Sequence, residues 1–166
     1  MKYAQIREFD VSNGVGIRTT LFVSGCHGLC DGCFNKDYWD FDFGTEWSKE
    51  IEDKFIEFGK KKIITGFSFL GGEPLMQNKD IMINLLKRIK SETHKSIWMW
   101  TGFELEKLTK SQKEIIKYVD ILVDGRFIID KKNLKLSFRG SSNQRILHND
   151  GFGNWENKSE FYDNKI

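Results

Sequence analysis

Apolar residues occur along the chain in short runs that end at glycine or polar residues. The run 17–23 is rich in β-branched residues and stops at Ser24-Gly25, which predicts a buried strand leading into a loop. Similar runs at 63–70, 97–100 and 121–123 predict three further strands, and each of them is followed by a segment that contains glycine.

Three segments between these runs show the spacing of amphipathic helices. Ser48 is a predicted N-cap for a helix that reaches Lys60, and apolar residues recur at helical spacing over 82–89 and again over 104–118. The alternation of strand, polar loop and helix predicts an α/β fold with parallel strands. A complete (β/α) barrel takes about 250 residues, and the chain has 166. We therefore expect a partial, open (β/α) barrel.

The predicted strands place the chemically interesting loops at one edge of the sheet. Polar or glycine-containing segments follow the strands at 24–35, 71–74, 100–102 and 124–125. Active sites of parallel α/β folds lie at the carboxyl ends of their strands. We assign residues 1–149 to one domain and 150–166 to a polar C-terminal tail, which holds no motif and whose removal we expect to be tolerated.

The composition and charge of the chain argue against nucleic-acid and membrane partners. The chain is 39% hydrophobic, enough for a single core, and its 26 Lys and Arg against 24 Asp and Glu leave a net charge of +2. Because these charges are spread along the chain, we expect no nucleic-acid partner. No apolar run approaches the roughly 18 residues of a membrane span. We expect a cytoplasmic protein without a membrane partner.

The chain has three cysteines, Cys26, Cys30 and Cys33, in a C-x3-C-x2-C pattern. An odd, clustered set favours metal ligation in a reducing compartment over disulfides. Three thiolates on a glycine-rich loop can bind three corners of a 4Fe-4S cluster, which leaves one iron without a protein thiolate. The alternative is a structural zinc site with His27 as fourth ligand, although adjacent residues rarely chelate one tetrahedral ion well.

This cysteine pattern resembles the signature of the radical S-adenosylmethionine (SAM) superfamily. The resemblance implies an open barrel of the radical SAM type, in which Cys26, Cys30 and Cys33 hold the cluster and take part in catalysis. It implies that the open iron binds SAM and that an electron from the cluster cleaves SAM to give a 5'-deoxyadenosyl radical. Phe34 and Asn35 follow the third cysteine as in the activating-protein branch, where Gly32 replaces an aromatic residue. Residues 32–35 are thereby expected to contribute to the SAM site.

Gly71-Gly72-Glu73-Pro74 matches the second motif of that superfamily and follows the second of the predicted strands. Glycines let a backbone approach a ligand closely, and a carboxylate accepts hydrogen bonds from an ammonium group. Glu73 is therefore a candidate partner for the amine of SAM. Thr101 and Asp124, at two other strand ends, are candidates for contact with ribose or carboxylate groups.

Further segments resemble the activating proteins of anaerobic ribonucleoside-triphosphate reductase. These segments are 98–103, 120–127, 139–145 and the Asn-Gly-x-Gly-x-Arg stretch at 13–18, in which Val15 replaces a proline. The resemblance implies that the radical removes hydrogen from a glycine Cα of the large reductase subunit, and that reduced flavodoxin or a similar donor reduces the cluster.

Two other functions remain open from the sequence. The chain could be a radical SAM enzyme that acts on a small molecule, or on another glycyl radical enzyme such as pyruvate formate-lyase. It could also be an iron-sulfur or zinc module without catalytic activity. Anaerobic reconstitution with iron and sulfide, followed by spectra with and without SAM, separates this last reading from the others.

Overall fold

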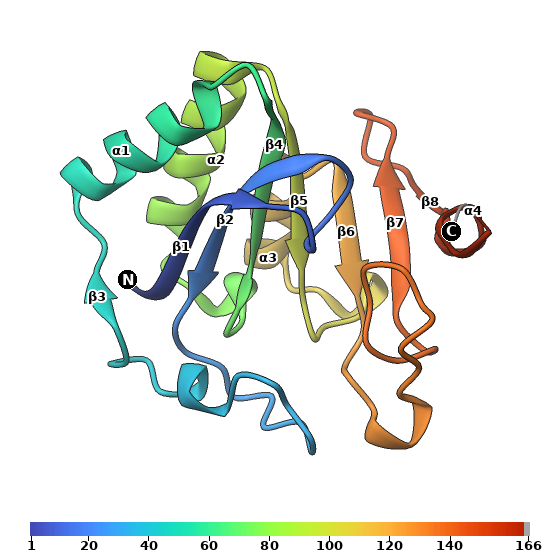
Figure 1. Cartoon of the computed structure of the whole chain (residues 1–166). Coiled ribbons are helices and arrows are strands. Elements are labelled where there is room, and N and C mark those ends of the chain that lie inside the picture. The colour runs from blue at the N-terminus through green and yellow to red at the C-terminus, as the bar shows by residue number, and fades with distance from the viewer. Residues whose placement is uncertain (165–166) are drawn as a thin grey trace.

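The computed structural model describes residues 1–164, which form one sheet with helices packed on it (Figure 1). The strands are β1 (Lys2–Asp10), β2 (Ile17–Val23), β3 (Thr45–Glu46), β4 (Ile64–Gly71), β5 (Ser96–Trp100), β6 (Ile121–Asp124), β7 (Arg145–Asn149) and β8 (Trp155–Asn157). The α-helices are α1 (Lys49–Lys60), α2 (Lys79–Thr93), α3 (Lys110–Ile116) and α4 (Ser159–Asp163). Short 3-10 helices span Lys36–Trp39, Pro74–Met76, Leu105–Lys107 and Ile129–Lys131.

The centre of the sheet is parallel, as the sequence predicts. Strands β2, β4, β5 and β6 are neighbours in that order and run in the same direction. Helices α1, α2 and α3 connect them in turn and lie on one face of the sheet (Figure 1). Ser48 caps α1 as expected, because its hydroxyl oxygen accepts a hydrogen bond from the N–H of Ile51.

The two margins of the sheet differ from the prediction of parallel strands alone. Strand β1 pairs antiparallel with β2, β7 pairs antiparallel with β6, and β8 pairs antiparallel with β7. The fold is therefore α/β with a mixed, open sheet that has β3 and β8 at its edges. Strand β1 is largely half-buried and β8 has polar, exposed positions, so neither produces the continuous apolar run that marks the central strands.

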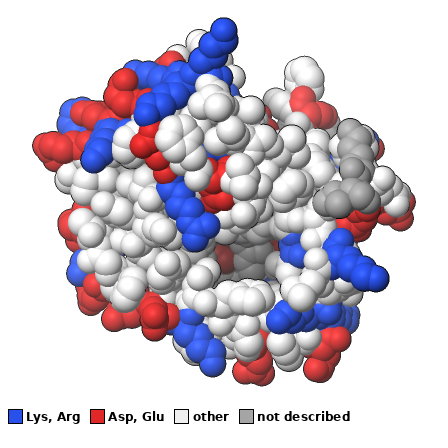
Figure 2. Space-filling model, in the orientation of Figure 1, with Lys and Arg blue, Asp and Glu red and all other residues white. Residues whose placement is uncertain are grey.

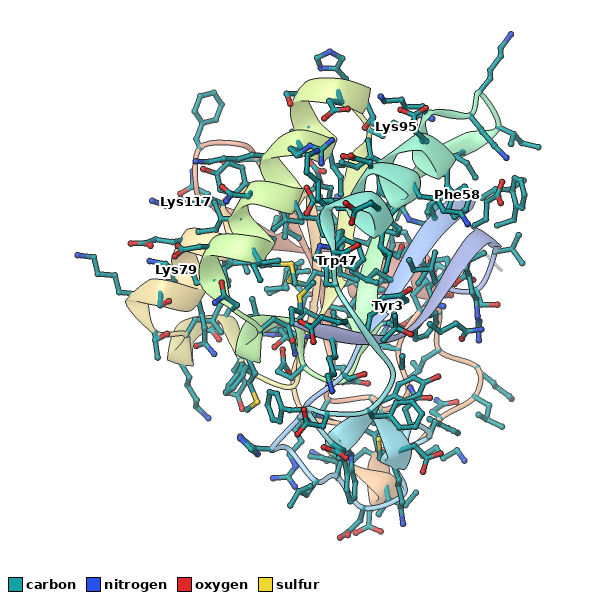
Figure 3. All side chains as sticks on the ribbon, turned by 90° about the vertical axis from the view of Figure 1, so that its left-hand side faces the viewer. Tyr3, Trp47, Phe58, Lys79, Lys95 and Lys117 are labelled. Atoms are coloured by element: carbon teal, nitrogen blue, oxygen red, sulfur yellow. The ribbon has the colours of Figure 1, made fainter. Side chains whose placement is uncertain are left out.

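The main core lies between the sheet and helices α1 to α3. Phe55 of α1 and Leu85 of α2 are fully buried against sheet residues such as Phe67 and Met99. The core extends to the N-terminal strand, where Tyr3 and Trp47 pack edge to face beside α1 (Figure 3).

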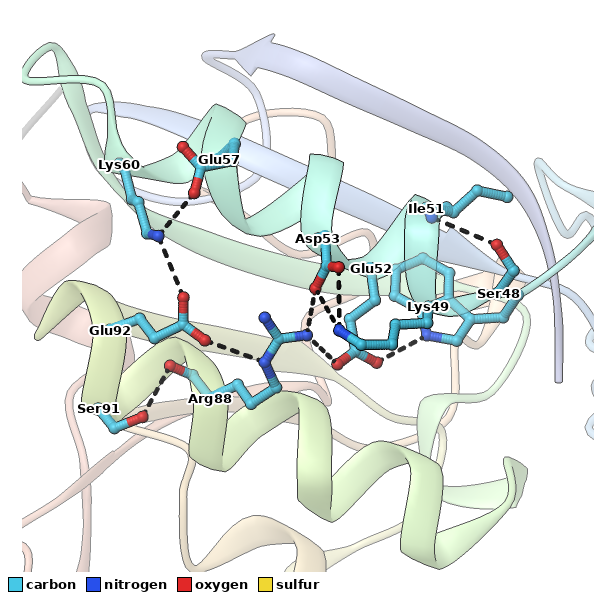
Figure 4. Close-up of polar contacts among 11 residues, drawn as sticks. Ser48, Lys49, Ile51, Glu52, Asp53, Glu57, Lys60, Arg88, Ser91 and Glu92 are labelled. Carbon is cyan, nitrogen blue, oxygen red and sulfur yellow. Dashed lines mark hydrogen bonds and ion pairs between the residues drawn. The ribbon is translucent and has the colours of Figure 1, made fainter.

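An ion-pair network joins the outer surfaces of α1 and α2 (Figure 4). Arg88 of α2 pairs with Glu52 and Asp53 of α1 and with Glu92 of its own helix, and Lys60 bridges from α1 to Glu92. Single exposed pairs contribute at most about 1 kcal/mol, but a network holds both helices in one relative position. None of the helices between residues 1 and 164 combines the length and apolar character that a membrane crossing requires.

Arg18 organises the opposite face of the sheet. Its side chain is almost fully buried, and its guanidinium donates to the hydroxyls of Ser68 and Ser96 and to three backbone carbonyls. A Cβ on Gly14, which has φ of +112°, would lie 2.7 Å from Arg18 Cδ and 3.0 Å from the Trp98 ring. The Asn-Gly-x-Gly-x-Arg stretch is therefore explained by packing, since the arginine ties β2, β4 and β5 together.

The segment after Asn149 packs on this same face, which the sequence does not predict. Tyr162 of α4 is 7% exposed and lies against Trp98 and Phe138, while its hydroxyl is 2.7 Å from Nε2 of His148. The guanidinium of Arg139 donates two hydrogen bonds, of 2.9 and 2.6 Å, to the carboxylate of Asp163. Residues 150–164 thus cover a second, smaller core.

Truncation of this aromatic contact tests the packing role of the tail. Tyr162→Ala should lower the free energy of unfolding by about 3 kcal/mol, because it removes a buried ring and leaves a cavity beside Trp98. The measurement is chemical denaturation, with Phe152→Ala as control, because Phe152 is 92% exposed. Equal stability of the two variants, or normal stability of a chain that ends at Asn149, would contradict this packing role.

Candidate active site

The carboxyl ends of β2, β4, β5 and β6 surround one cavity of about 460 Å³. Small-molecule sites usually fall within about 300 to 1,000 Å³. The cavity brings together the cysteine loop, the segment after β4, Thr101 to Phe103 after β5 and Gly125 to Phe127 after β6. Four loops that are far apart in the sequence therefore meet as the strand order predicts.

The cysteine loop is anchored to the fold by backbone hydrogen bonds. The N–H of Gly25 donates to the carbonyl of Tyr38, that of Cys26 to Trp39, and that of Glu73 to the carbonyl of Gly25. These contacts fix the start of the loop between the ends of β2 and β4. The position of Cys26 is thereby tied to that of Glu73.

The three thiols are free, partly buried and at the cavity wall. The N–H of Gly28 lies 3.2 Å from Cys26 Sγ, and that of Asn35 lies 3.5 Å from Cys33 Sγ. A Cβ on Gly28 would lie 3.2 Å from Cys26 Sγ and 3.8 Å from Cys30 Sγ, so glycine leaves space between these two sulfurs. Hydrogen bonds to sulfur are one means by which proteins tune an iron-sulfur cluster.

This donor set fits a 4Fe-4S cluster with one iron free of protein thiolate. The sequence holds only three cysteines, and each would bind a different iron of a cubane. Among residues 1–164, no three His, Cys, Asp or Glu side chains are placed to hold a single metal ion. The ring of His27 packs on Phe41 with 4.9 Å between ring centroids.

Glu73 is a buried carboxylate on the wall of the same cavity. It is 3% exposed; its Oε1 accepts from the N–H of Leu75 at 3.0 Å, and its Oε2 accepts from the N–H of Gly102 at 2.8 Å. Burial raises the pKa of Glu73 to about 7, against the lowering effect of the hydrogen bonds from Gly102, Leu75 and Thr101. Within the described part of the chain, no Lys, Arg or His side chain pairs with it.

The glycines before Glu73 allow two strand ends to approach each other. A Cβ on Gly72 would lie 2.6 Å from the carbonyl oxygen of Gly25, and one on Gly71 would lie 2.8 Å from that of Val23. Any side chain at these positions would push the Glu73 segment away from the cysteine loop. Gly71, Gly72 and Asn35 all line the cavity.

Thr101 reaches the cavity, whereas Asp124 does not. Thr101 is 4% exposed at the cavity wall, and its Oγ1 accepts from the N–H of Phe103. The Asp124 carboxylate is fully buried and accepts hydrogen bonds from Arg145 on both oxygens and from the N–H of Leu105. Arg145 and the N–H of Leu105 thus bind the carboxylate of Asp124, and its expected contact with a ligand stays a prediction.

Asp124, Arg145 and Glu106 form a clamp beside the cavity. Arg145 donates to both oxygens of Glu106, at 2.9 and 2.8 Å, as well as to Asp124. The clamp joins the ends of β6 and β7 to the segment 101–106, which carries the Gly102 N–H that binds Glu73. The sequence could not reveal this pairing, because it links residues that are distant along the chain.

Gly32 and Phe34 lie outside the cavity wall. Gly32 has φ of +71°, and a Cβ there would lie 2.7 Å from Cδ1 of Ile129, so the absence of a side chain lets Ile129 cover the loop. Phe34 is 71% exposed and its ring lies 6.0 Å from that of Phe127.

Several cavity residues are not identified by the sequence reasoning. They include Trp39, Met76, Phe103, Arg126, Phe127 and Gln144. Four of them fall within the segments 98–103, 120–127 and 139–145, which the sequence singles out without assigning roles to individual residues. Trp39 and Met76 carry no signal, since an isolated aromatic residue or methionine is common in any core.

Comparison with known proteins agrees with this geometry. A family model described as "4Fe-4S single cluster domain" matches residues 12–147. The chain is 43% identical over 152 residues to the anaerobic ribonucleoside-triphosphate reductase-activating proteins of Salmonella typhimurium and Vibrio cholerae. Both alignments cover 89% of this chain, and they cover 99% of the Salmonella protein and 97% of the Vibrio protein. The protein of that name from Escherichia coli is 41% identical over 152 residues, with 89% and 99% covered. The chain therefore belongs to the family of anaerobic ribonucleoside-triphosphate reductase-activating proteins and carries its 4Fe-4S single cluster domain.

Proposed function

We propose that the protein is a radical SAM enzyme that installs a glycyl radical on the large subunit of anaerobic ribonucleoside-triphosphate reductase. Cys26, Cys30 and Cys33 would hold a 4Fe-4S cluster, which would leave one iron without a thiolate for SAM. When bound, the cluster would supply the electron for cleavage of SAM to methionine and a 5'-deoxyadenosyl radical, which would take a hydrogen atom from a glycine Cα and leave as 5'-deoxyadenosine. The cytoplasm and reduced flavodoxin, or a similar donor, provide the reducing conditions.

One observation carries this proposal: three free thiols and an unpaired buried carboxylate share the wall of one cavity. A cluster with an open iron accounts for the thiols. An ammonium ligand accounts for Glu73, because a buried carboxylate needs a positive partner to remain ionised. SAM has both a group that can bind iron and an amine. The relatives are named as activating proteins of anaerobic ribonucleoside-triphosphate reductase, which supports this reductase as the partner.

The roles of the other residues follow from their places. The backbone at Gly71 and Gly72 approaches the methionyl part of SAM, and Thr101 and Asn35 provide polar contacts from the cavity wall. The unit formed by 1–149 acts as a radical SAM domain with an open barrel, and residues 150–164 complete its packing. Asp124 holds the segment 101–106 in place, because it accepts a hydrogen bond from the N–H of Leu105 and binds Arg145, which also binds Glu106.

Replacement of the Glu73 charge tests the ammonium contact. Glu73→Gln should weaken SAM binding about tenfold or more while the iron content stays unchanged, because a hydrogen bond to a charged group contributes about 1.5 to 3 kcal/mol. The wild-type affinity should also fall as the pH drops below about 7, where the carboxyl of the free protein gains a proton. Equilibrium binding at several pH values measures both effects.

A matched control is Glu104→Gln, which removes an exposed carboxylate near the same cavity. That variant should bind SAM with the wild-type affinity and pH dependence. If Glu73→Gln behaves like it, the ammonium group of SAM binds elsewhere.

Isotope transfer tests the proposed substrate. The reduced enzyme is mixed with SAM and with reductase whose glycines carry deuterium at Cα. Deuterium should appear in 5'-deoxyadenosine, and a glycyl doublet should appear in the electron paramagnetic resonance spectrum of the reductase. Cys30→Ala should abolish both signals.

The same experiment separates the alternative substrates. Transfer of label from a small metabolite, or from pyruvate formate-lyase and never from the reductase, would refute the proposed substrate and leave the radical SAM assignment intact. The absence of any SAM cleavage by the iron-loaded protein would refute both.

A further inference from the structure

An exposed apolar surface borders the cavity, here called the apolar rim and formed by Leu29, Phe34, Phe127 and Ile129. Leu29 is 54% exposed, Phe34 71% and Ile129 43%. The four residues come from two loops, the cysteine loop and the loop after β6, which extend from the same edge of the sheet (Figure 1).

The members of the rim are joined by contacts between the two loops. The rings of Phe34 and Phe127 lie 6.0 Å apart, and Ile129 occupies the space that the missing side chain of Gly32 leaves open. Arg126 donates to the carbonyl of Leu29 at 3.4 Å. Since Phe127 also lines the cavity, the rim continues directly into the cavity wall.

Leu29 is held in an unusual backbone conformation. Its φ is +45°, in the left-handed region that residues other than glycine rarely adopt. Such a conformation costs free energy and commonly occurs where function requires it. Here it accompanies a leucine that the fold leaves more than half exposed and that adjoins the cluster ligand Cys30.

The two loops that carry the rim hold more positive than negative side chains, although the exposed carboxylates Asp31 and Asp130 also lie in them. Arg126, Lys131, Lys132 and Lys135 lie in the loop after β6, and none of them pairs with a carboxylate in the described residues. The ammonium of Lys132 lies 5.1 Å from the centre of the Phe34 ring. Figure 2 shows Lys and Arg side chains beside the hollow in the lower part of this face.

We propose that the apolar rim docks the reductase segment that flanks the substrate glycine, and that this segment is apolar with acidic residues. The inference rests on the proposed function, because a glycine of a large protein can enter the cavity only if neighbouring residues of that protein cover the cavity mouth. Apolar side chains that continue into the cavity wall provide the contact, and unpaired cations select a partner of opposite charge.

Two substitutions test the docking surface without altering the cavity wall. Ile129→Asp should weaken binding of the purified large reductase subunit at least tenfold, because it places a charge within the apolar contact. Lys132→Glu should also weaken binding and reduce its dependence on salt. Phe152→Asp is the matched control, since Phe152 is 92% exposed on the turn before β8 and should leave the affinity unchanged.

The readouts separate docking from chemistry. Iron content and SAM cleavage driven by dithionite without the reductase should equal those of the wild type, which also shows that each variant is folded. Glycyl radical yield should fall at low reductase concentration and recover at high concentration. Unchanged reductase affinity in both variants would overturn the proposal.

Two further outcomes have distinct meanings. If the variants slow reduction by flavodoxin but bind the reductase normally, the rim serves the electron donor and the proposal is wrong. If the wild type binds the reductase through the rim but forms no glycyl radical on it, docking stands and the proposed function fails.

Discussion

The carboxylate of Glu73 is buried, and among residues 1–164 no Lys, Arg or His side chain pairs with it. It lies at the end of β4, where Gly71 and Gly72 bring it against the start of the cysteine loop. Its oxygens accept hydrogen bonds from the N–H groups of Leu75 and Gly102 and from the side chain of Thr101. These hydrogen bonds do not offset the hydration that the carboxylate loses on burial, so the pKa of Glu73 rises to about 7. The site therefore favours a ligand that brings positive charge.

The surrounding structure serves to hold this carboxylate and the thiols in one place. Arg145 binds Asp124 and Glu106, and this clamp fixes the segment whose Gly102 N–H reaches Glu73. On the other side, the backbone of Glu73 donates to Gly25, next to the first cysteine. A shift of either support would move Glu73 relative to the three cysteines, and preorganisation of this kind is what catalysis by positioning requires.

The sequence predicts the centre of the fold and the meeting of the cysteine loop with Glu73 at one cavity, because both have local signals. Apolar runs that end at or near glycine mark β2, β4, β5 and β6, and the cysteine spacing marks the cysteine loop. It does not predict the antiparallel strands at the two margins of the sheet. Nor does it predict the packing of α4, because this short helix has no apolar pattern that would indicate the burial of Tyr162. Nor could it show that Asp124 binds Arg145, since that contact depends on the pairing of β6 with β7.

The most direct test of this account is the titration of Glu73 itself in the cluster-containing protein. Infrared difference spectra of carboxyl-labelled protein, with the spectra of Glu73→Gln subtracted, report the ionisation of this one group. The account predicts titration near pH 7 without SAM, and an ionised carboxylate that persists to lower pH when SAM is bound. Titration near 4.5, the ordinary value for a glutamate, or a pKa that SAM leaves unchanged, would contradict it.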